Sequence, residues 1–336
     1  MGSPDNLLAI EQMRGQRKHS MINDGIAGLG SAWSSEKVSG VVERRNILHN
    51  WHFINPVNQR GLLEYVAPLI GVNSLIQTID RWIMWNAVNN TTPGRIELIS
   101  EGVRLFKGSH YFTFCQRVEN PSRFLGFPLT FSAIVNNKLY SLTYVAHFHD
   151  RNTNRFFIYR QIADTGFYMG VQMRSDHNFL EIYIGSMGSI SNGFKIGDYI
   201  DIQAIKLELG TISTLANDPP PNPALELAVC QRYQRRITHN GNGVSFVTHA
   251  SDVRQNEIFF FIPLSAMRVA PVITNMNGLA PLLVRRNYNA PNETGFTFVV
   301  ASHREHGVGI LASKTNHGMA DANLYSNPGT LLDANL

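Results

Sequence analysis

The residues best suited to metal chemistry are the run His147-Phe-His149-Asp150. If this run lies in a strand, His147 and His149 share a face, and two imidazoles on one face can ligate a single metal ion. No third ligand follows at a recognised spacing, and residues 150–154 have the composition of a polar turn. The sequence therefore predicts no metal site and no other cofactor.

Carboxylates would be needed for polysaccharide cleavage, because most glycosidases place two of them beside the scissile bond. The motifs G-x-S-x-G, H-E-x-x-H and C-x-x-C do not occur, and the glycine-containing run 185–193 lacks the lysine of a phosphate loop. We therefore expect a protein that is not an enzyme. Four glutamates are the candidate carboxylates, and their spacing pairs no two of them: Glu97, Glu101, Glu119 and Glu181.

Aromatic and amide side chains are suited to binding sugars, because the face of a sugar ring stacks on an aromatic ring and its hydroxyls need polar partners. We expect the best candidates to be Trp85 and a loop that carries His149, Asn152 and Asn154. Other plausible suppliers of such groups are Asn86, Tyr111 and Tyr168.

Short strands separated by turns must position these residues. Charged residues make up only 16% of the chain and aromatic residues 10%, with 27 glycines and 15 prolines, which favours an all-β fold with broad buried faces. In Tyr199–Leu209 the apolar phase changes between Ala204 and Ile205, which predicts a β-bulge. Asn136-Asn137 predicts a turn. We expect strands at Leu139–Val145, Phe179–Ile184, Phe259–Leu264, Gly295–Ala301, Gly307–Ser313 and Leu331–Leu336.

The 336 residues exceed one typical domain. We predict an N-terminal attachment arm or linker over residues 1–40, a jelly-roll β-sandwich over 41–233 and a smaller β-sandwich over 234–336. The arm is glycine-rich, and a helix is expected at 5–18, the only helix that the spacing supports. Whether the arm is disordered or docks on another chain stays open.

Composition also limits the partners. The net charge of +4 is mild and the basic residues are scattered, so nucleic-acid binding is not expected. No apolar stretch is long enough for a membrane span, and the N-terminus leads into no apolar signal region. Cys115 and Cys230 each lie in an apolar, strand-like run and are interpreted as two buried free thiols, with a single disulfide as the alternative.

The most distinctive pattern lies in the middle of the chain. Lys206–Thr214 alternates as a strand does, with Leu207 and Leu209 on one face and its charged residues on the other. The gap 218–223 holds four prolines, which excludes a helix interior and a central strand. An apolar, ordered segment, Glu226–Tyr233, follows.

This pattern resembles the junction between two β-sandwiches in phage and prophage tail-fibre proteins, of the form K-L-E-x-G-x-x-x-T…P…E-L-x-x-C-Q-R-Y. Four further segments are similar to motifs of that family, in the same order along the chain. They are Asn50–Gly61 (N-x-x-F-x-N-P-V-N-Q-R-G), Thr78–Trp82 (x-I-D-R-W), Ile262–Arg268 with Pro271 (L-P-x-x-M-R-x-x-P), and Leu332–Leu336, where Asn335 replaces the glutamate of x-D-A-E-L.

The residues of these motifs have structural explanations of their own. Trp82, on an alternating run, is interpreted as a core aromatic residue rather than a sugar platform. We expect the asparagines of the first motif to form a turn. Ion pairs that pin strand ends are expected from Arg60, Asp80 and Arg81.

The resemblance implies a jelly-roll module similar to carbohydrate-binding and galactose-binding-like domains, followed by a smaller β domain. It also implies a structural virion protein of the tail-fibre or spike type, made in the bacterial host cytoplasm and often homotrimeric. Such a protein would contact other virion proteins (tail, collar or baseplate) through residues 1–40 and would bind a glycan on the host cell surface.

Two alternatives stay open. One is a polysaccharide-degrading enzyme of a phage tail, with His147, His149 and Asp150 or a carboxylate pair as its site. The other is a purely architectural virion subunit that binds no receptor. The two differ from receptor binding in a measurable way, because the first would depolymerise a glycan and the second would bind none.

Overall fold

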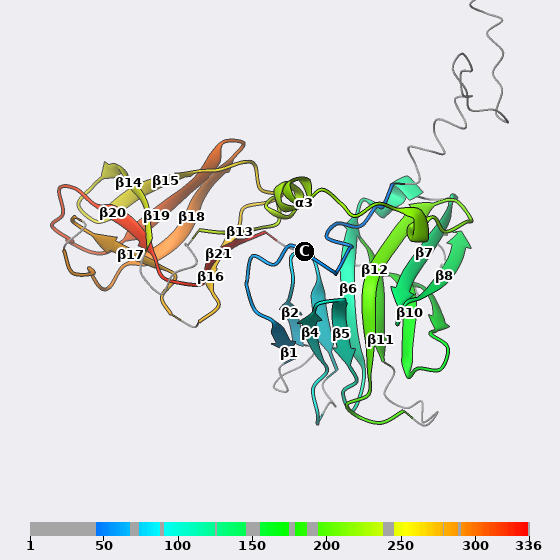
Figure 1. Ribbon diagram of the computed structural model, residues 1–336. Coiled ribbons are helices and arrows are strands. Elements are labelled where there is room, and N and C mark those ends of the chain that lie inside the picture. Colours follow the sequence, from blue (N-terminus) through cyan, green and yellow to red (C-terminus); the bar gives the residue numbers. More distant parts are fainter. Residues whose placement is uncertain are drawn as a thin grey trace, which may run out of the picture.

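The chain folds into two antiparallel β-sandwiches, one after the other along the sequence (Figure 1). The all-β architecture predicted from composition and alternation is confirmed. The N-terminal arm and the helix expected at 5–18 lie outside the described residues. The computed structural model describes residues 45–67, 74–87, 91–124, 126–145, 155–174, 179–186, 194–237, 245–277, 279–287 and 290–334.

The first sandwich consists of two six-stranded sheets with the strand orders β1-β4-β5-β12-β7-β8 and β2-β3-β6-β11-β10-β9. The chain passes between the sheets several times, as in a jelly roll. Both sheets contribute to one core, in which Trp82, Phe114 and Phe131 have no exposed surface. The strands are β1 (Glu64–Val66), β2 (Ser74–Gln77), β3 (Ile83–Asn86), β4 (Arg95–Ile99), β5 (Gly102–Phe106), β6 (Phe112–Glu119), β7 (Pro128–Val135), β8 (Lys138–Val145), β9 (Arg155–Gln161), β10 (Phe167–Arg174), β11 (Phe179–Ser186) and β12 (Tyr199–Leu209).

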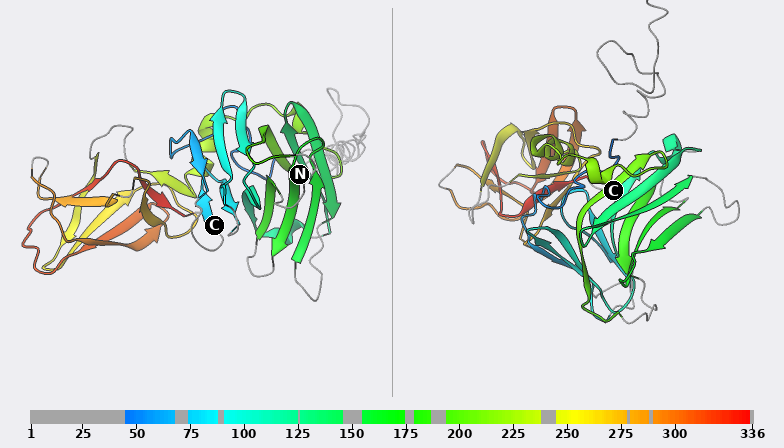
Figure 2. Two further views of the ribbon diagram at one scale, coloured as in Figure 1. Left: turned by 90° about the horizontal axis from the view of Figure 1, so that it is seen from below. Right: turned by 45° about the vertical axis from the view of Figure 1, so that its right-hand side comes forward.

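The second, smaller sandwich combines the three-stranded sheet β13-β21-β16 with the six-stranded sheet β17-β20-β14-β15-β19-β18. Its separate core includes Phe260, Ile310 and Leu324. Figures 1 and 2 show the two sandwiches as distinct bodies that meet near the C-terminus, where Figure 1 labels β13 and β21. The strands are β13 (Gln234–Arg236), β14 (Ser245–Val253), β15 (Glu257–Pro263), β16 (Val272–Asn275), β17 (Leu282–Arg285), β18 (Thr297–Arg304), β19 (Gly307–Ser313), β20 (Asn323–Ser326) and β21 (Thr330–Asp333).

The strands predicted from alternation are present, as β8, β11, β15, β18, β19 and β21. The register of β12 against β7 shifts between Ile202 and Ala204, so the predicted bulge is confirmed. Asn136 and Asn137 both have positive φ and join β7 to β8, as the turn prediction requires. Local patterns were therefore sufficient to locate these elements.

Residues Pro223–Cys230 form helix α3, which the sequence analysis did not predict. The side chain of Asn222 caps it by accepting from the backbone N–H groups of Ala224 and Leu225, and a proline occupies its first turn. Eight residues are too few for helical periodicity to stand out. Cys230 therefore lies on a helix, not in a strand-like run. It and Cys115, on β6, are buried thiols that form no disulfide.

Two short 3-10 helices, η1 (Pro121–Phe124) and η2 (Leu215–Asn217), lie beside the first sandwich. Helix α3 exposes apolar side chains, and Leu225 is 67% exposed.

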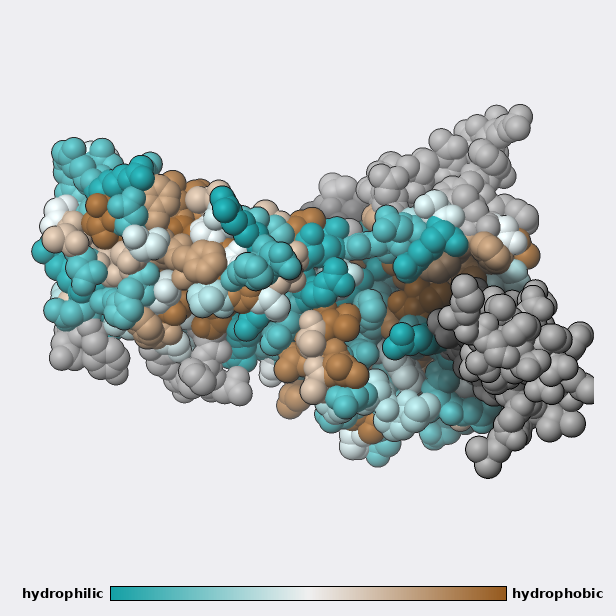
Figure 3. Space-filling view, turned by 90° about the horizontal axis from the view of Figure 1, so that it is seen from above, coloured by the Kyte–Doolittle hydropathy of each residue, from teal (hydrophilic) through white to brown (hydrophobic). Residues whose placement is uncertain are grey.

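Seen from above, hydrophobic residues (brown) gather near the middle of the molecule and in a recess of the first sandwich (Figure 3). No helix among the described residues is long and apolar enough to cross a membrane.

Candidate functional site

A groove of about 530 Å³ lies on the outer face of the sheet that contains β3, β6, β11 and β10. Antiparallel pairing places residues from strands far apart in sequence in rows across this face. One row contains Trp85, Thr113 and Gly185, and the next contains Cys115, Tyr183 and Gly170. A third row contains Arg117, Glu181 and Gln172. We call this hollow the groove.

One wall of the groove is aromatic. Trp85, at the end of β3, is half-buried and meets Tyr111 edge to face, with ring centroids 6.0 Å apart. Alternation along β3 turns Trp85 outward, while Met84 and Asn86 turn into the sandwich. A half-buried indole fixed in this way presents an apolar surface on which the face of a sugar ring can stack.

Gly170, on the same face of the sheet, leaves room for the ring of Tyr183, which lines the groove. A Cβ atom at Gly170 would lie 2.3 Å from the hydroxyl oxygen of Tyr183, the residue opposite it on β11. The ring of Tyr183 therefore lies across β10 instead of standing away from the sheet. Beside it, Tyr159 and Tyr168 meet edge to face at 5.6 Å, which adds further aromatic surface next to the groove.

The other end of the groove is polar. Arg117 Nε lies 3.2 Å from Glu181 Oε2, and the amide of Gln172 donates to Glu181 Oε1. The guanidinium of Arg117 also lies 4.4 Å from the ring centre of Phe179. These contacts hold a donor, an acceptor and an amide in one line across three strands, an arrangement that suits hydrogen bonds to sugar hydroxyls.

Tyr183 and Tyr111 stay protonated at neutral pH. Burial raises the pKa of Tyr183 well above its usual range, and Tyr111 and Glu181 raise it further. Burial also raises the pKa of Tyr111, followed by the neighbouring Tyr159 and Tyr168. The hydroxyl group of Tyr111, a half-buried residue that lines the groove, therefore keeps the ability to donate a hydrogen bond to a ligand, whereas the hydroxyl oxygen of Tyr183 is buried.

The structure brings one of the four best sugar-binding candidates, Trp85, into the groove. His149, Asn152 and Asn154 lie outside the described residues, as does the whole His147–Asp150 run. Among the wider suppliers, Tyr111 lines the groove, and Tyr168 lies on the same face of β10 as Gln172 but is only 4% exposed. Asn86 is a correction: it is 1% exposed and on the opposite face of β3, so its amide is not available to a ligand there.

The four candidate glutamates do not assemble into a pair at the groove. Glu181 is the single carboxylate among the described residues that line it, and Glu119 pairs with Arg268 at the far end of β6. Glu97 lies on β4 in the other sheet, and Glu101 is an exposed turn residue. Within the described part of the chain, no group of three or more His, Cys, Asp or Glu side chains is placed to hold a metal ion.

The sequence analysis missed the polar row of the groove, apart from Glu181 as one of four unpaired carboxylates. The register of three strands brings together Arg117, Gln172 and Glu181, so their spacing in the sequence does not predict the row. Gly170 was missed as well, although a glycine inside a strand pattern is a signal of close approach by a neighbouring group.

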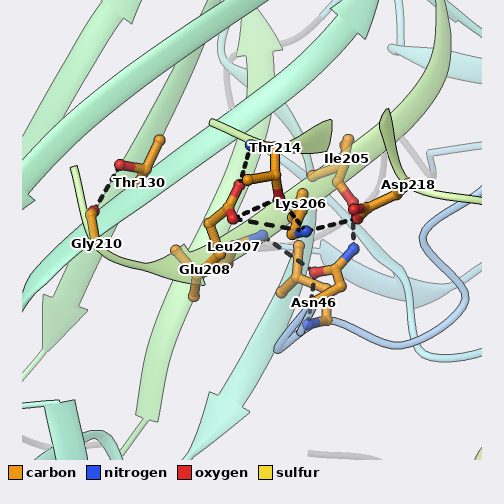
Figure 4. Close-up of polar contacts among 10 residues, drawn as sticks. Asn46, Thr130, Ile205, Lys206, Leu207, Glu208, Gly210, Thr214 and Asp218 are labelled. Atoms are coloured by element: carbon orange, nitrogen blue, oxygen red, sulfur yellow. Dashed lines mark hydrogen bonds and ion pairs between the residues drawn. The ribbon is translucent and has the colours of Figure 1, made fainter. Parts of the chain in front are cut away.

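The charged residues of the distinctive central pattern form a buried network and not a site (Figure 4). Lys206 and Glu208 are 1% and 0% exposed on β12. Lys206 Nζ lies 2.6 Å from Asp218 Oδ2 and donates to the hydroxyl of Thr214 at 2.7 Å. Glu208 accepts from the backbone N–H and hydroxyl of Thr214, at 2.8 and 2.7 Å. The network holds the chain after β12 against the sandwich.

Asn46 fastens another segment to the same strand. Its amide donates to the carbonyl oxygen of Ile205 at 2.8 Å, and its Oδ1 accepts from the N–H of Leu207 at 3.1 Å (Figure 4). The N–H of Leu48 donates to the same Oδ1 at 3.0 Å. Strand β12 therefore holds two segments: the one around Asn46, through its own backbone, and the one that follows β12, through the side chains of Lys206 and Glu208.

The other motif segments meet where the two sandwiches join, in a cluster that we call the joint. Arg60 pairs with Asp333 at 3.2 Å, and Asp80 accepts from the Gln234 amide at 3.3 Å and from the Gln59 N–H at 2.9 Å. The Gln59 side chain also donates to the carbonyl oxygen of Gln234 at 2.7 Å. Segments separated by more than 150 residues are thus connected by hydrogen bonds within a buried region.

The structure tests two interpretations of the motif residues: that Trp82 is a core aromatic residue, and that Arg60, Asp80 and Arg81 form ion pairs. Trp82 is fully buried, and its indole N–H donates to the carbonyl oxygen of Asn50 at 2.8 Å, as expected of a core aromatic residue. Arg60 forms the expected ion pair. Asp80 and Arg81 differ: the first is held by amide donors, and the second lies over the ring of Tyr233 at 3.5 Å.

Comparison with known proteins does not assign the chain to a family. No family model, no curated protein and no solved structure matches the chain.

Proposed function

We propose that this chain is the receptor-binding subunit of a tail-fibre or spike, and that the groove binds a glycan on the surface of the host cell. The observation that carries the proposal is the groove itself, with Trp85 and Tyr111 at one end and the row Arg117, Glu181 and Gln172 at the other. An aromatic surface beside fixed polar groups is what recognition of a sugar ring requires.

Binding is favoured over cleavage by the carboxylates. Glycosidases in most families place two carboxyl groups about 5 to 10 Å apart across the bond that they break. The groove has Glu181, whose two oxygens are already engaged by Arg117 and Gln172. A carboxylate held in this way serves better as a fixed acceptor than as an acid or nucleophile.

The rest of the proposal concerns assembly. We propose a homotrimer that attaches to other virion proteins through residues 1–40, with the groove presented away from the particle. This part depends on the resemblance to tail-fibre proteins and on the order of the parts along the chain. Light scattering of the purified full chain tests it, because a mass three times that of the chain is expected.

Binding of the fluorescently labelled protein to whole bacterial cells tests the function. We expect binding that periodate oxidation of the cell glycans abolishes, and a loss of about fivefold or more in affinity for Trp85→Ala, since stacking is worth about 1 kcal/mol or more. Tyr199→Ala is the matched control, because Tyr199 is an exposed aromatic residue on the other sheet.

Other outcomes point to other functions. Periodate-insensitive or absent binding by a folded trimer would support a purely architectural virion subunit. Release of reducing sugar from the same cells would instead support a polysaccharide-degrading enzyme, and Glu181→Gln would then be the first variant to examine. Equal loss in Trp85→Ala and Tyr199→Ala would remove the groove from the binding model.

A further inference from the structure

A second, more polar hollow lies where β6 ends and the chain leaves helix α3. It has a volume of about 200 Å³ and is lined by residues of the first sandwich together with Arg232 and Tyr233. We call it the arginine pocket. Four arginines line it, against the single carboxylate Glu119: Arg81, Arg117, Arg123 and Arg232.

The acidic groups near this pocket are already paired with other cations. Glu119 lies 3.0 Å from Arg268, and Arg117 is engaged by Glu181 in the groove. The remaining three arginines, Arg81, Arg123 and Arg232, form no ion pair with any residue that the structure describes. The pocket therefore has an excess of positive charge.

Arg81 is the residue of the pocket whose geometry points most directly to anion binding. It is 6% exposed, and its Nε is buried without a hydrogen-bond partner among the described residues. Its backbone has φ 72°, a left-handed conformation that non-glycine residues rarely adopt. The guanidinium is held by stacking on Tyr233 at 3.5 Å and by donating to the carbonyl oxygen of Arg117 at 3.0 Å. Strain and an unused buried donor often mark a functional position.

The imidazole of His49 responds to the same charge. Burial lowers the pKa of His49 to about 4, and Arg81, Arg232 and Arg123 contribute to the decrease. His49 is therefore neutral at neutral pH, and the positive charge of the pocket comes from its arginines alone.

We propose that the arginine pocket binds one oxyanion group, a carboxylate or a phosphate. Guanidinium groups bind both by paired N–H···O bonds, and three of them in a small polar pocket form a specific site for such a group. The volume suits a single group and not an oligosaccharide. Because Arg117 lines both the pocket and the groove, a charged glycan is one source of the group. The proposal does not require glycan binding in the groove.

Isothermal titration calorimetry of the full chain tests the proposal, at pH 7 and constant ionic strength. The probes are sodium glucuronate, inorganic phosphate and, as a neutral control, glucose. We expect saturable binding of at least one anion, no binding of glucose, and affinity at least about tenfold lower in Arg123→Gln/Arg232→Gln, since charge-assisted hydrogen bonds to two guanidinium groups are lost. Arg304→Gln, an exposed arginine on the second sandwich, should bind as the unmodified chain does.

The two anionic probes distinguish between the possible sources of the oxyanion group. Binding of glucuronate alone assigns the pocket to the carboxylate of an acidic sugar, and binding of phosphate alone assigns it to a phosphate group. No saturable binding of either anion by the unmodified chain at about 10 mM overturns the proposal, as does equal binding by the double variant. Both substituted arginines are exposed, so the double variant should fold, and the single variant Arg232→Gln replaces it if it does not.

Discussion

At the scale of single residues, Gly170 controls the shape of the groove. A Cβ atom there would press on the Tyr183 ring, which has to move off β10 toward the space that a ligand would occupy. We expect Gly170→Ala to weaken glycan binding by about tenfold and to lower the free energy of unfolding by about 1 to 3 kcal/mol, because the new methyl group meets the ring of a buried tyrosine.

Cell binding and urea unfolding of the same variant check this prediction together. The double variant Gly170→Ala/Tyr183→Ala serves as the control, since it removes the ring that Gly170→Ala displaces. Restored binding in the double variant would agree with the mechanism. Unchanged binding in Gly170→Ala would show that Tyr183 does not border the ligand.

His49 gives a prediction for pH dependence. Its pKa is about 4 in the fold and 6.5 in the unfolded chain, so the unfolded chain binds more protons between these values. The contribution of His49 to the free energy of unfolding is therefore full above pH 6.5 and is lost as the pH falls toward 4. We expect a loss of up to about 3 kcal/mol.

The comparison of His49→Gln with the unmodified chain isolates this effect, because Asp80 acts in the opposite direction. Burial raises the pKa of Asp80 to about 6, so its contribution decreases as the pH rises from about 4 to 6. Urea unfolding between pH 4 and 7 in phosphate-free buffer should show a difference between the two proteins that grows on acidification and favours His49→Gln. A difference that is constant with pH would contradict the assignment.

Residue types alone identified part of the candidate site. An aromatic residue in an alternating strand pattern is detectable, so Trp85 and Tyr111 could be named. The polar row could not, because Arg117 and Glu181 are 64 residues apart and become neighbours only through the β6–β11 register. The same holds for the arginine pocket, where Arg81 and Arg232 meet through tertiary structure.

At the scale of elements, β12 is the strand that organises the first sandwich. Alternation predicted its two faces and its bulge, but not that the face with Lys206 and Glu208 is buried too. A charged face usually signals exposure to solvent, and here the chain after β12 folds back to cover it. Such coverage depends on the course of the following segment, which a local pattern does not contain.

Lys206→Met tests the importance of this network. Removing the ammonium leaves the Glu208 and Asp218 carboxylates without their cation, and Glu208 is fully buried. Breaking one side of a buried ion pair costs about 3 to 5 kcal/mol, and we expect a decrease of that size in the free energy of unfolding.

Urea unfolding followed by fluorescence measures it. Lys138→Met is the control, because Lys138 is an exposed lysine on β8 of the same sheet. Adding Glu208→Leu to Lys206→Met should recover part of the loss, since the fully buried carboxylate is then removed and only the partly exposed Asp218 lacks its cation. If Lys206→Met proves as stable as Lys138→Met, the network is not a major source of stability.

At the scale of the whole molecule, the joint decides whether the two sandwiches act as one body. The five motif segments of the sequence contribute to this region, in addition to filling the two cores, and the central one does so through the Tyr233 carbonyl oxygen, which accepts from the Ala334 N–H at 2.6 Å. Their spacing along the chain is thus explained by contacts between the sandwiches. A groove on one sandwich then keeps a constant orientation relative to the other, which an elongated appendage would need.

Gln234 is the residue on which this coupling depends most directly. It is 1% exposed; its Oε1 accepts from Arg60, its amide donates to Asp80, and its carbonyl oxygen accepts from Gln59. Gln234→Leu keeps the side-chain volume but leaves a buried carboxylate and a guanidinium each short of one partner. Unsatisfied buried groups cost about 1 to 3 kcal/mol, so we expect a lower unfolding temperature in calorimetry.

Small-angle X-ray scattering of Gln234→Leu should also show a wider range of overall dimensions, as the sandwiches reorient. Gln255→Leu, at an exposed glutamine of the second sandwich, controls for the substitution itself. Scattering curves that coincide for the two variants would mean that the remaining contacts, including the Arg60–Asp333 pair, suffice to hold the sandwiches together.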